Sequence, residues 1–212
     1  MSFIFSQEIQ KNRGNMPIGT PKIPYTRYKK TAFLTLYEGL HDGRILFLWE
    51  NIEFSIVNKI IALLLFLNEQ DDDDILLFIN SHGGKVLPAI ALYDTIDFLD
   101  SDVSTLAIGS VVSAASLILV GGAIPKRIAF PHVRIMIHQP STGYFRGSAK
   151  YIQMQAEELS KLRNTIAEIY AQNTGQPLNV IQEDLERDNF MSAEEAKDYG
   201  IIDTIIIKKN PW

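Results

Sequence analysis

A serine and a histidine stand where a parallel sheet would hold a reacting group. Ser113 comes just after the apolar stretch 103–109 and begins a predicted helix, and His138 ends the stretch "VRIMIH", residues 133–138. Open α/β sheets bind their ligands beyond the carboxyl ends of the strands, where both side chains are expected to lie. Two interpretations of Ser113 are open: a helix N-cap, or a nucleophile with nearby backbone N–H groups as an oxyanion site.

A serine nucleophile and a histidine base need an acid that orients the imidazole. The residues before Ser113 do not form the GxSxG turn of the α/β hydrolases. The glycine pair of "SHGGK", residues 81–85, follows a buried strand, and its backbone can approach a ligand closely. The residues alone therefore predict a serine hydrolase whose acid is unassigned. Spacing leaves four candidates for that acid: Asp184, Glu186, Asp188 and Asp203.

Apolar stretches alternate with helical periodicities along the chain. Near-continuous apolar strands such as residues 75–80 are typical of a parallel sheet that is buried on both faces. The alternation predicts βαβ crossovers and an α/β fold with a largely parallel sheet. The predicted strands are 44–50, 75–80, 103–109, 127–130 and 133–138, and the predicted helices are 55–70, 87–99, 113–120, 149–173 and 192–203.

The helix predicted over residues 149–173 carries one apolar stripe at steps of three and four residues. It exceeds the average helix about twofold in length, so we expect it to pack against more than its own domain. The helix over residues 192–203 has Ser192 and Glu195 as a capping box and Gly200 as its stop.

The stretch 105–124 is almost entirely apolar, and a membrane helix is an alternative for it. Glycines near both of its ends favour a strand, a turn and a short helix instead. Its three serines are then unequal. Ser110 and Ser116 are predicted to be small packing residues, and Ser113 is the candidate nucleophile.

Composition excludes several other classes of function. The chain has 212 residues, a net charge of −5 and no cysteine, which argues against a general nucleic-acid binder, a disulfide framework and a cysteine metal site. The four aspartates 71–74 predict a solvated loop, with a metal site as the alternative. No metal and no cofactor are expected for this chain.

Four strings of the sequence stand out by their order and spacing: "FINSHGGKV", "GSVVSAASLILVGG", "KRIAFPHVRIMIHQP" and "LERDNFMSAEEAKDYGIID". In both respects they resemble the proteolytic subunit family of the Clp protease (ClpP). The resemblance runs from about residue 44 to residue 203, and the segment "MPIGTPKIP", residues 16–24, is similar to the start of plastid-encoded members.

The resemblance implies a ClpP/crotonase-like fold and assigns roles to residues of the site. By it Ser113 is the nucleophile, His138 the general base and Asp188 the orienting acid. The amides of Gly84 and Ala114 would form the oxyanion hole.

The same resemblance implies an assembly of homologous subunits. Family members form heptameric rings stacked as a tetradecamer around a chamber, fed with unfolded proteins by an AAA+ unfoldase such as ClpC, which uses the ATP. The helix 149–173 would be the handle between the rings. Residues 1–25 would be a flexible arm at the ring axis that contacts the unfoldase, and residues 26–212 the peptidase domain. No nucleic-acid or membrane partner is expected, and the location would be the plastid stroma or, alternatively, the bacterial cytoplasm.

The sequence departs from the family pattern at the site. His82 stands where proline is usual, and Val111-Val112 and Ala114 flank Ser113 in place of alanines and methionine. Two alternatives to an active peptidase therefore stay open. One is a structural ring subunit without turnover, as in the ClpR subunits, and the other is a crotonase-like acyl-CoA enzyme.

Overall fold

The computed structural model describes residues 22–27, 30–141, 143 and 146–206. The chain divides into two compact units between Gly43 and Arg44. The division does not coincide with the expected boundary between residues 25 and 26. Of the expected arm, residues 1–21 lie outside the described residues, whereas residues 22–25 belong to a strand.

The smaller unit contains a hairpin followed by a short helix. β1 (Lys22–Arg27) pairs antiparallel with β2 (Lys30–Thr35), and α2 (Leu36–Asp42) follows directly. The Thr35 hydroxyl accepts the N–H of Glu38 at 3.3 Å, and the Glu38 carboxylate accepts the N–H of Thr35 at 2.6 Å, which closes a capping box. The sequence pattern predicts none of these three elements.

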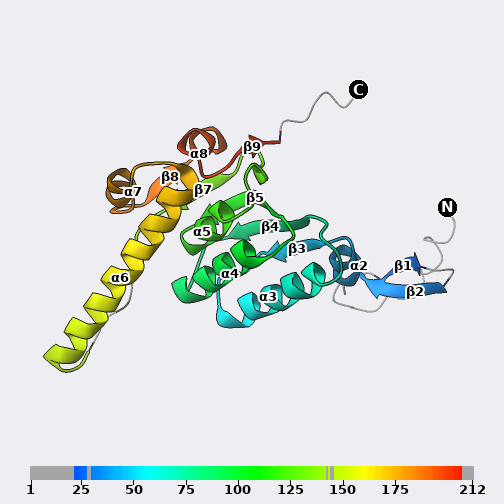
Figure 1. Cartoon of the computed structure of the whole chain (residues 1–212), viewed down its shortest axis with the longest axis horizontal. Coiled ribbons are helices and arrows are strands. Elements are labelled where there is room, and N and C mark those ends of the chain that lie inside the picture. Colours follow the sequence, from blue (N-terminus) through cyan, green and yellow to red (C-terminus); the bar gives the residue numbers. More distant parts are fainter. Residues whose placement is uncertain (1–21, 28–29, 142, 144–145, 207–212) are drawn as a thin grey trace, which may run out of the picture. The chain divides into compact units, whose positions relative to one another are not determined.

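A seven-stranded sheet forms the centre of the larger unit (Figure 1). Strands β3, β4, β5, β6 and β9 lie side by side in this order, and every neighbouring pair is parallel. β7 pairs parallel with β5 and antiparallel with β8. The predicted α/β fold with a largely parallel sheet is confirmed. The strands are β3 (Ile45–Leu48), β4 (Ile75–Ser81), β5 (Val103–Val112), β6 (Arg127–Ala129), β7 (Arg134–Ile137), β8 (Asn189–Met191) and β9 (Thr204–Ile205).

β5 has two successive partners along the same edge. Its residues 105–107 pair with β6, and its residues 110–112 pair with β7. The strand therefore continues three residues beyond the predicted end at Gly109, because β7 supplies backbone partners that are distant in sequence. Ser113 leaves the sheet directly beside β7 as a result.

The predicted helices are present within one or two residues of their expected bounds, except that the last one is shorter. α8 has the expected capping box and ends at Gly200, which adopts the left-handed conformation. α7 is not predicted by the sequence pattern. The helices of this unit are α3 (Phe54–Asn68), α4 (Val86–Phe98), α5 (Ala114–Val120), α6 (Ala149–Thr174), α7 (Leu178–Asp184) and α8 (Ala193–Tyr199). Within the described residues, none of the helices combines the length and the hydrophobicity that crossing a bilayer requires.

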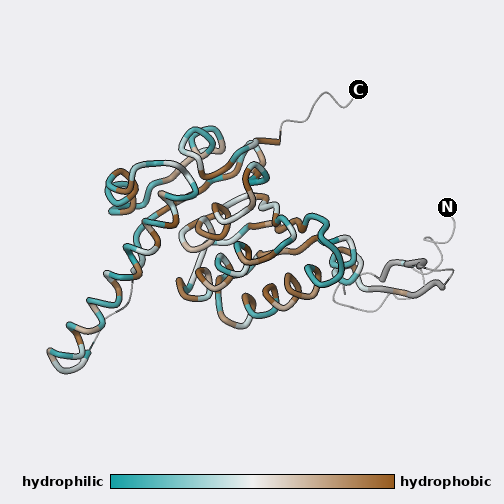
Figure 2. The backbone as a smooth tube through the Cα atoms, in the orientation of Figure 1, coloured by the Kyte–Doolittle hydropathy of each residue, from teal (hydrophilic) through white to brown (hydrophobic). Residues whose placement is uncertain are grey.

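Burial is concentrated where the sheet meets its helices. Every residue of α5 is buried, and the side chains of β4 alternate between buried and half-buried positions. Figure 2 shows the corresponding hydrophobic segments in the strands of the larger unit. α5 is therefore a core helix, and Ser113 lies half-buried at its start.

α6 is buried only near its C-terminal end. Residues 166, 167, 169 and 170 are buried, whereas Tyr151, Ile152 and Met154 near the start of the helix are 41–49% exposed. In Figure 1 this helix extends away from the sheet. The first half of its apolar stripe is therefore not covered by the described residues of this chain.

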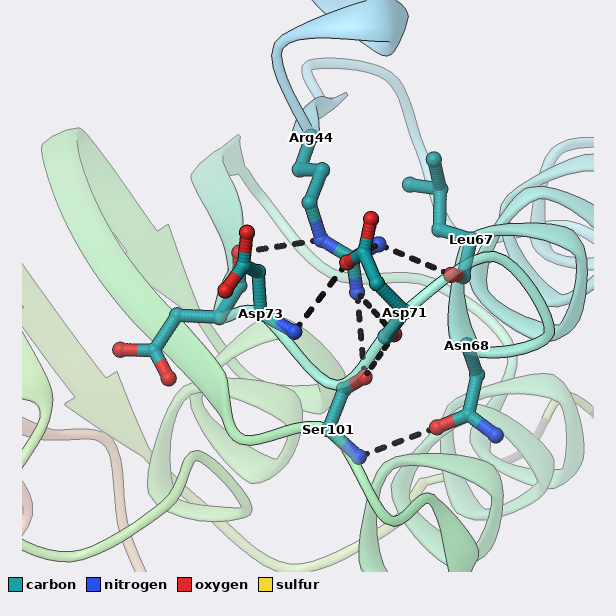
Figure 3. A network of polar contacts seen from close by, with 7 residues as sticks. Arg44, Leu67, Asn68, Asp71, Asp73 and Ser101 are labelled. Atoms are coloured by element: carbon teal, nitrogen blue, oxygen red, sulfur yellow. Dashed lines mark hydrogen bonds and ion pairs between the residues drawn. The ribbon is translucent and has the colours of Figure 1, made fainter.

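A buried arginine holds the acidic loop against the fold (Figure 3). The Arg44 guanidinium donates to the carbonyl of Leu67 at 2.8 Å, near the C-terminus of α3, and to the Ser101 hydroxyl at 3.0 Å. The Asp71 carboxylate lies 2.7 Å from the same guanidinium. Asp74 pairs with Lys126 at 2.7 Å. The first and last aspartates of the loop 71–74 thus serve as counterions within the fold.

Candidate active site

Ser113 has a backbone conformation that is unusual for a residue with a side chain. Its φ is 58° and its ψ is −127°, a region that non-glycine residues enter at an energetic cost and that is enriched at functional sites. Its N–H donates to the carbonyl of Met136 in β7 at 2.9 Å. Ser113 occupies the N-cap position of α5, but its side chain makes no capping hydrogen bond. The hydroxyl is directed to a different partner.

That partner is His138. Nε2 of His138 lies 2.7 Å from Oγ of Ser113, and Nδ1 lies 3.0 Å from Oδ1 of Asp188. His138 follows β7 and Asp188 precedes β8, and the antiparallel register pairs Ile137 with Asn189. The histidine and the aspartate are the next residues in that register. Backbone pairing therefore brings together two side chains that are 50 residues apart.

The other three candidate acids are engaged elsewhere. Asp203 forms an ion pair with Arg127 at 2.6 Å, Asp184 accepts the hydroxyl of Tyr199 at 2.6 Å, and Glu186 pairs with Arg163. Burial raises the pKa of Tyr199, and its hydrogen bond to Asp184 adds to that rise, so the phenol stays a donor. Of the four acids left open by spacing, Asp188 is the one that reaches His138.

The glycine loop 81–85 packs tightly against the serine. A Cβ added to Gly83 would lie 2.6 Å from the carbonyl oxygen of Val112 and 2.9 Å from Cβ of Ser113. The loop is fixed on its other side, because Ile52 donates to Gly83 at 2.8 Å and accepts from Lys85 at 2.9 Å. In such a parallel bridge the N–H of the intervening Gly84 points away from Ile52. Gly84 is exposed, and its amide is not used by the bridge.

A groove leads up to these residues. It has a volume of about 600 Å³ and runs between the loop 82–88 and α6, whose Gln155, Glu158, Leu159 and Leu162 form one wall. A much smaller cavity of about 20 Å³ adjoins Ser113 and His138 and is lined by apolar side chains. The two spaces share Val86 and Pro140, so the groove ends at the serine. An extended chain lying in it would have one end directed toward Ser113.

One prediction about the three serines of the stretch 105–124 is wrong. Ser116 is not a packing residue without a polar role, because its hydroxyl lies within 2.9 Å of three oxygen atoms. One of these belongs to Tyr170 of α6, a residue that the sequence pattern does not single out. The only sequence signal was the position of Ser116, one turn after Ser113 in an otherwise apolar helix.

Comparison with known proteins agrees with the resemblance drawn from the motifs. The profile of the family described as "Clp protease" matches residues 28–209. An "ATP-dependent Clp protease proteolytic subunit" of Chaetosphaeridium globosum is 48% identical over 195 residues, which cover 91% of this chain and 97% of that protein. The "Chloroplastic ATP-dependent Clp protease proteolytic subunit 1" of Arabidopsis thaliana is 47% identical over 196 residues, 91% of this chain and 100% of the relative. The chain belongs to the Clp protease family.

Proposed function

We propose that this chain is a serine endopeptidase subunit in which Ser113, His138 and Asp188 act as nucleophile, general base and orienting acid. The observation that carries the proposal is the continuous contact from Ser113 Oγ through the imidazole to the Asp188 carboxylate, at 2.7 and 3.0 Å. The backbone strain at Ser113 supports the proposal, because strained conformations persist only where the surrounding structure holds them in place and they cluster at active sites.

The proposed reaction follows from this order of atoms. The neutral imidazole carries its proton on Nδ1 and uses it to donate a hydrogen bond to the Asp188 carboxylate. Nε2 accepts the Ser113 proton while Oγ attacks the peptide carbonyl, so that His138 becomes an imidazolium. The imidazolium then gives that proton to the leaving amine as the C–N bond breaks. Water, deprotonated by His138 in turn, attacks the acyl-serine. As the bond between the acyl carbon and Oγ breaks, the imidazolium returns that proton to Oγ, which releases the second product and restores Ser113.

The negative charge on the attacked oxygen needs donors that are already in place. The amides of Gly84 and Ala114 are the proposed donors. Gly84 N–H is left free by the bridge to Ile52, and Ala114 follows the nucleophile directly. The departures from the family pattern at His82, Val111-Val112 and Ala114 do not remove either amide, because they change side chains and leave the backbone donors unaltered.

We infer that the chain works inside a ring assembly of ClpP or ClpR subunits, a tetradecamer fed by an AAA+ unfoldase such as ClpC. The exposed apolar residues in the first half of α6 support the proposed handle between the rings. The proposed axial contact with the unfoldase falls on residues 1–25, most of which lie outside the described residues. No cofactor is assigned to this chain, since ATP would be used by the partner.

The plastid stroma is the proposed location. The name of the Arabidopsis relative contains "Chloroplastic", and that relative is aligned over its whole length. A bacterial cytoplasm is the alternative.

Labelling with a fluorophosphonate probe tests the proposed activity. The assembled complex is isolated through this chain, treated with the probe, digested and analysed by mass, so that sister subunits are not counted. We expect phosphonylation of Ser113, loss of it in Ser113→Ala, and unchanged labelling in the control Ser110→Ala. An unlabelled Ser113 in a complex whose other subunits react would instead assign this chain to the ring subunits without turnover.

A further inference from the structure

Ser116 bridges the backbone of the nucleophile and that of the strand that carries the base. The Ser116 side chain is fully buried in α5. Its Oγ lies 2.6 Å from the carbonyl oxygen of Ser113 and 2.9 Å from that of Met136. Met136 also accepts the N–H of Ser113 at 2.9 Å and precedes His138 by two residues. One hydroxyl thus contacts both segments whose spacing sets the Ser113–His138 distance.

A third segment reaches the same hydroxyl. Tyr170 of α6 is 2% exposed, and its phenolic oxygen lies 2.8 Å from Ser116 Oγ. In the described part of the chain Ser116 is the hydrogen-bond partner of this phenol, so the phenol must donate to it to avoid a buried, unused proton. Ser116 then donates its own proton to the two backbone carbonyls. The direction of the chain is Tyr170 to Ser116 to the backbone at Ser113 and Met136.

We propose that Ser116 and Tyr170 are positioning residues for the nucleophile. The inference rests on the proposed peptidase function. The strained φ of Ser113 must be maintained by its surroundings, and the hydroxyl chain ties that residue to β7 and to α6. Without the bridge, Oγ of Ser113 loses its fixed distance to Nε2 of His138. Neither Ser116 nor Tyr170 lines the groove.

Three variants separate positioning from mere stability. Ser116→Ala removes the bridge and leaves the Tyr170 hydroxyl buried without a partner, so it lowers both the reaction rate and the stability. Tyr170→Phe keeps the ring and lets Ser116 go on donating to the carbonyls. In the double variant no hydroxyl is left without a partner, so stability recovers relative to Ser116→Ala, whereas the bridge is still missing.

The experiment measures saturation kinetics of fluorophosphonate labelling at Ser113, in the assembled complex and on this chain by mass, together with thermal unfolding. For Ser116→Ala we expect the maximal labelling rate to fall at least about tenfold, because small misplacement of reacting atoms is costly. The probe concentration at half-maximal rate should stay within about twofold, since no contact with the probe is lost. Tyr170→Phe should lose less of the maximal labelling rate than Ser116→Ala. The double variant should be more stable than Ser116→Ala, while its labelling stays slow. Ser110→Ala, in the same apolar stretch, is the matched control.

Two results would overturn the inference alone: labelling of Ser116→Ala at the wild-type rate, or recovery of rate and stability together in the double variant. The second result would assign both residues a purely structural role. A wild-type chain that is not labelled at Ser113 would overturn the proposed function, and this inference with it. The two failures are thus distinguished by the wild-type measurement.

Discussion

Replacing Asp188 by asparagine tests how much the third member of the proposed triad contributes. The carboxylate lies 3.0 Å from Nδ1 of His138, yet the Asp188 side chain is 62% exposed, compared with 26% for His138. Asparagine keeps the volume and removes the charge. It also presents an NH₂ group that can donate to Nδ1, which places the imidazole proton on Nε2, where it blocks acceptance of the serine proton.

The exposure of Asp188 limits the expected loss. Opposite unit charges about 4 Å apart attract by about 1 kcal/mol in water and about 4 kcal/mol at an effective dielectric constant of 20. A largely exposed carboxylate beside a partly buried imidazolium falls between these limits, at about 2 kcal/mol, or a rate loss of about 30-fold. The wrong tautomer adds to this loss. We therefore expect a loss of about 30-fold to 300-fold, well below the roughly 10⁴-fold that a buried triad aspartate contributes.

The assay is the second-order rate constant for fluorophosphonate labelling of Ser113 in the assembled complex. Glu186→Gln and Asp184→Asn are matched controls, because both acids precede Asp188 closely in sequence and contact other partners. They should label at the wild-type rate. A rate for Asp188→Asn within about threefold of wild type would refute the assignment of Asp188, since it falls outside the electrostatic range worked out above. An equal loss in a control would refute it too, because the effect would then not be specific to Asp188.

Three further predictions concern stability, assembly and the loop beside Ser113. Asp203→Asn leaves the buried Arg127 without its counterion and should lower the free energy of unfolding by about 3–5 kcal/mol. Burial opposes ionisation of Asp203, but the hydrogen bonds from Arg127 outweigh it and hold its pKa below the ordinary value. The stabilisation that ionised Asp203 adds to the folded state is therefore present at neutral pH and lost as the pH falls below about 4. Denaturation curves of Asp203→Asn and wild type should converge in acid. Leu159→Pro breaks α6 at a cost of about 3 kcal/mol or more. It should reduce double rings to single rings in native mass measurements, whereas Leu159→Ala should leave the double rings intact. An intact double ring with proline would contradict the handle assignment. Gly83→Ala places a methyl group against Ser113 and the backbone of Val112 and should therefore slow labelling of Ser113. Unimpaired labelling of that variant would show that the loop can move.

The larger unit could be predicted from the sequence wherever one residue pattern decided the structure. α6 begins at residue 149 as predicted because its apolar spacing and the capping Ser148 are local signals. β8 and β9 have three and two residues, too few for a period to be recognised, and they exist because β7 and β6 offer paired edges. The sequence also predicts the end of β5 three residues too early, because residues 110–112 pair with β7, which is distant in sequence. Partners that are distant in sequence decide where a strand stops.

The site was predictable in part. Ser113 and His138 follow from their places after strands, but the acid does not, because the register of β7 against β8 selects Asp188. The resemblance to the family supplied that choice where spacing left four residues open. The polar role of Ser116 does not follow from the sequence, since a serine in an apolar helix gives no sign of which carbonyls it contacts. The hairpin and helix over residues 22–42 carry no sustained period, and the family match extends into them only from residue 28.

The strain at Ser113 has an evolutionary consequence. Its φ of 58° and ψ of −127° are the mirror image of a common extended conformation, which glycine adopts without cost. A single codon change to glycine would therefore relieve strain while the backbone bonds that hold β5, β7 and β8 together remain. After a gene duplication, a copy freed from selection for chemistry would drift easily toward a well-folded subunit that lacks the hydroxyl. The serine at this position therefore stands against its own folding preference.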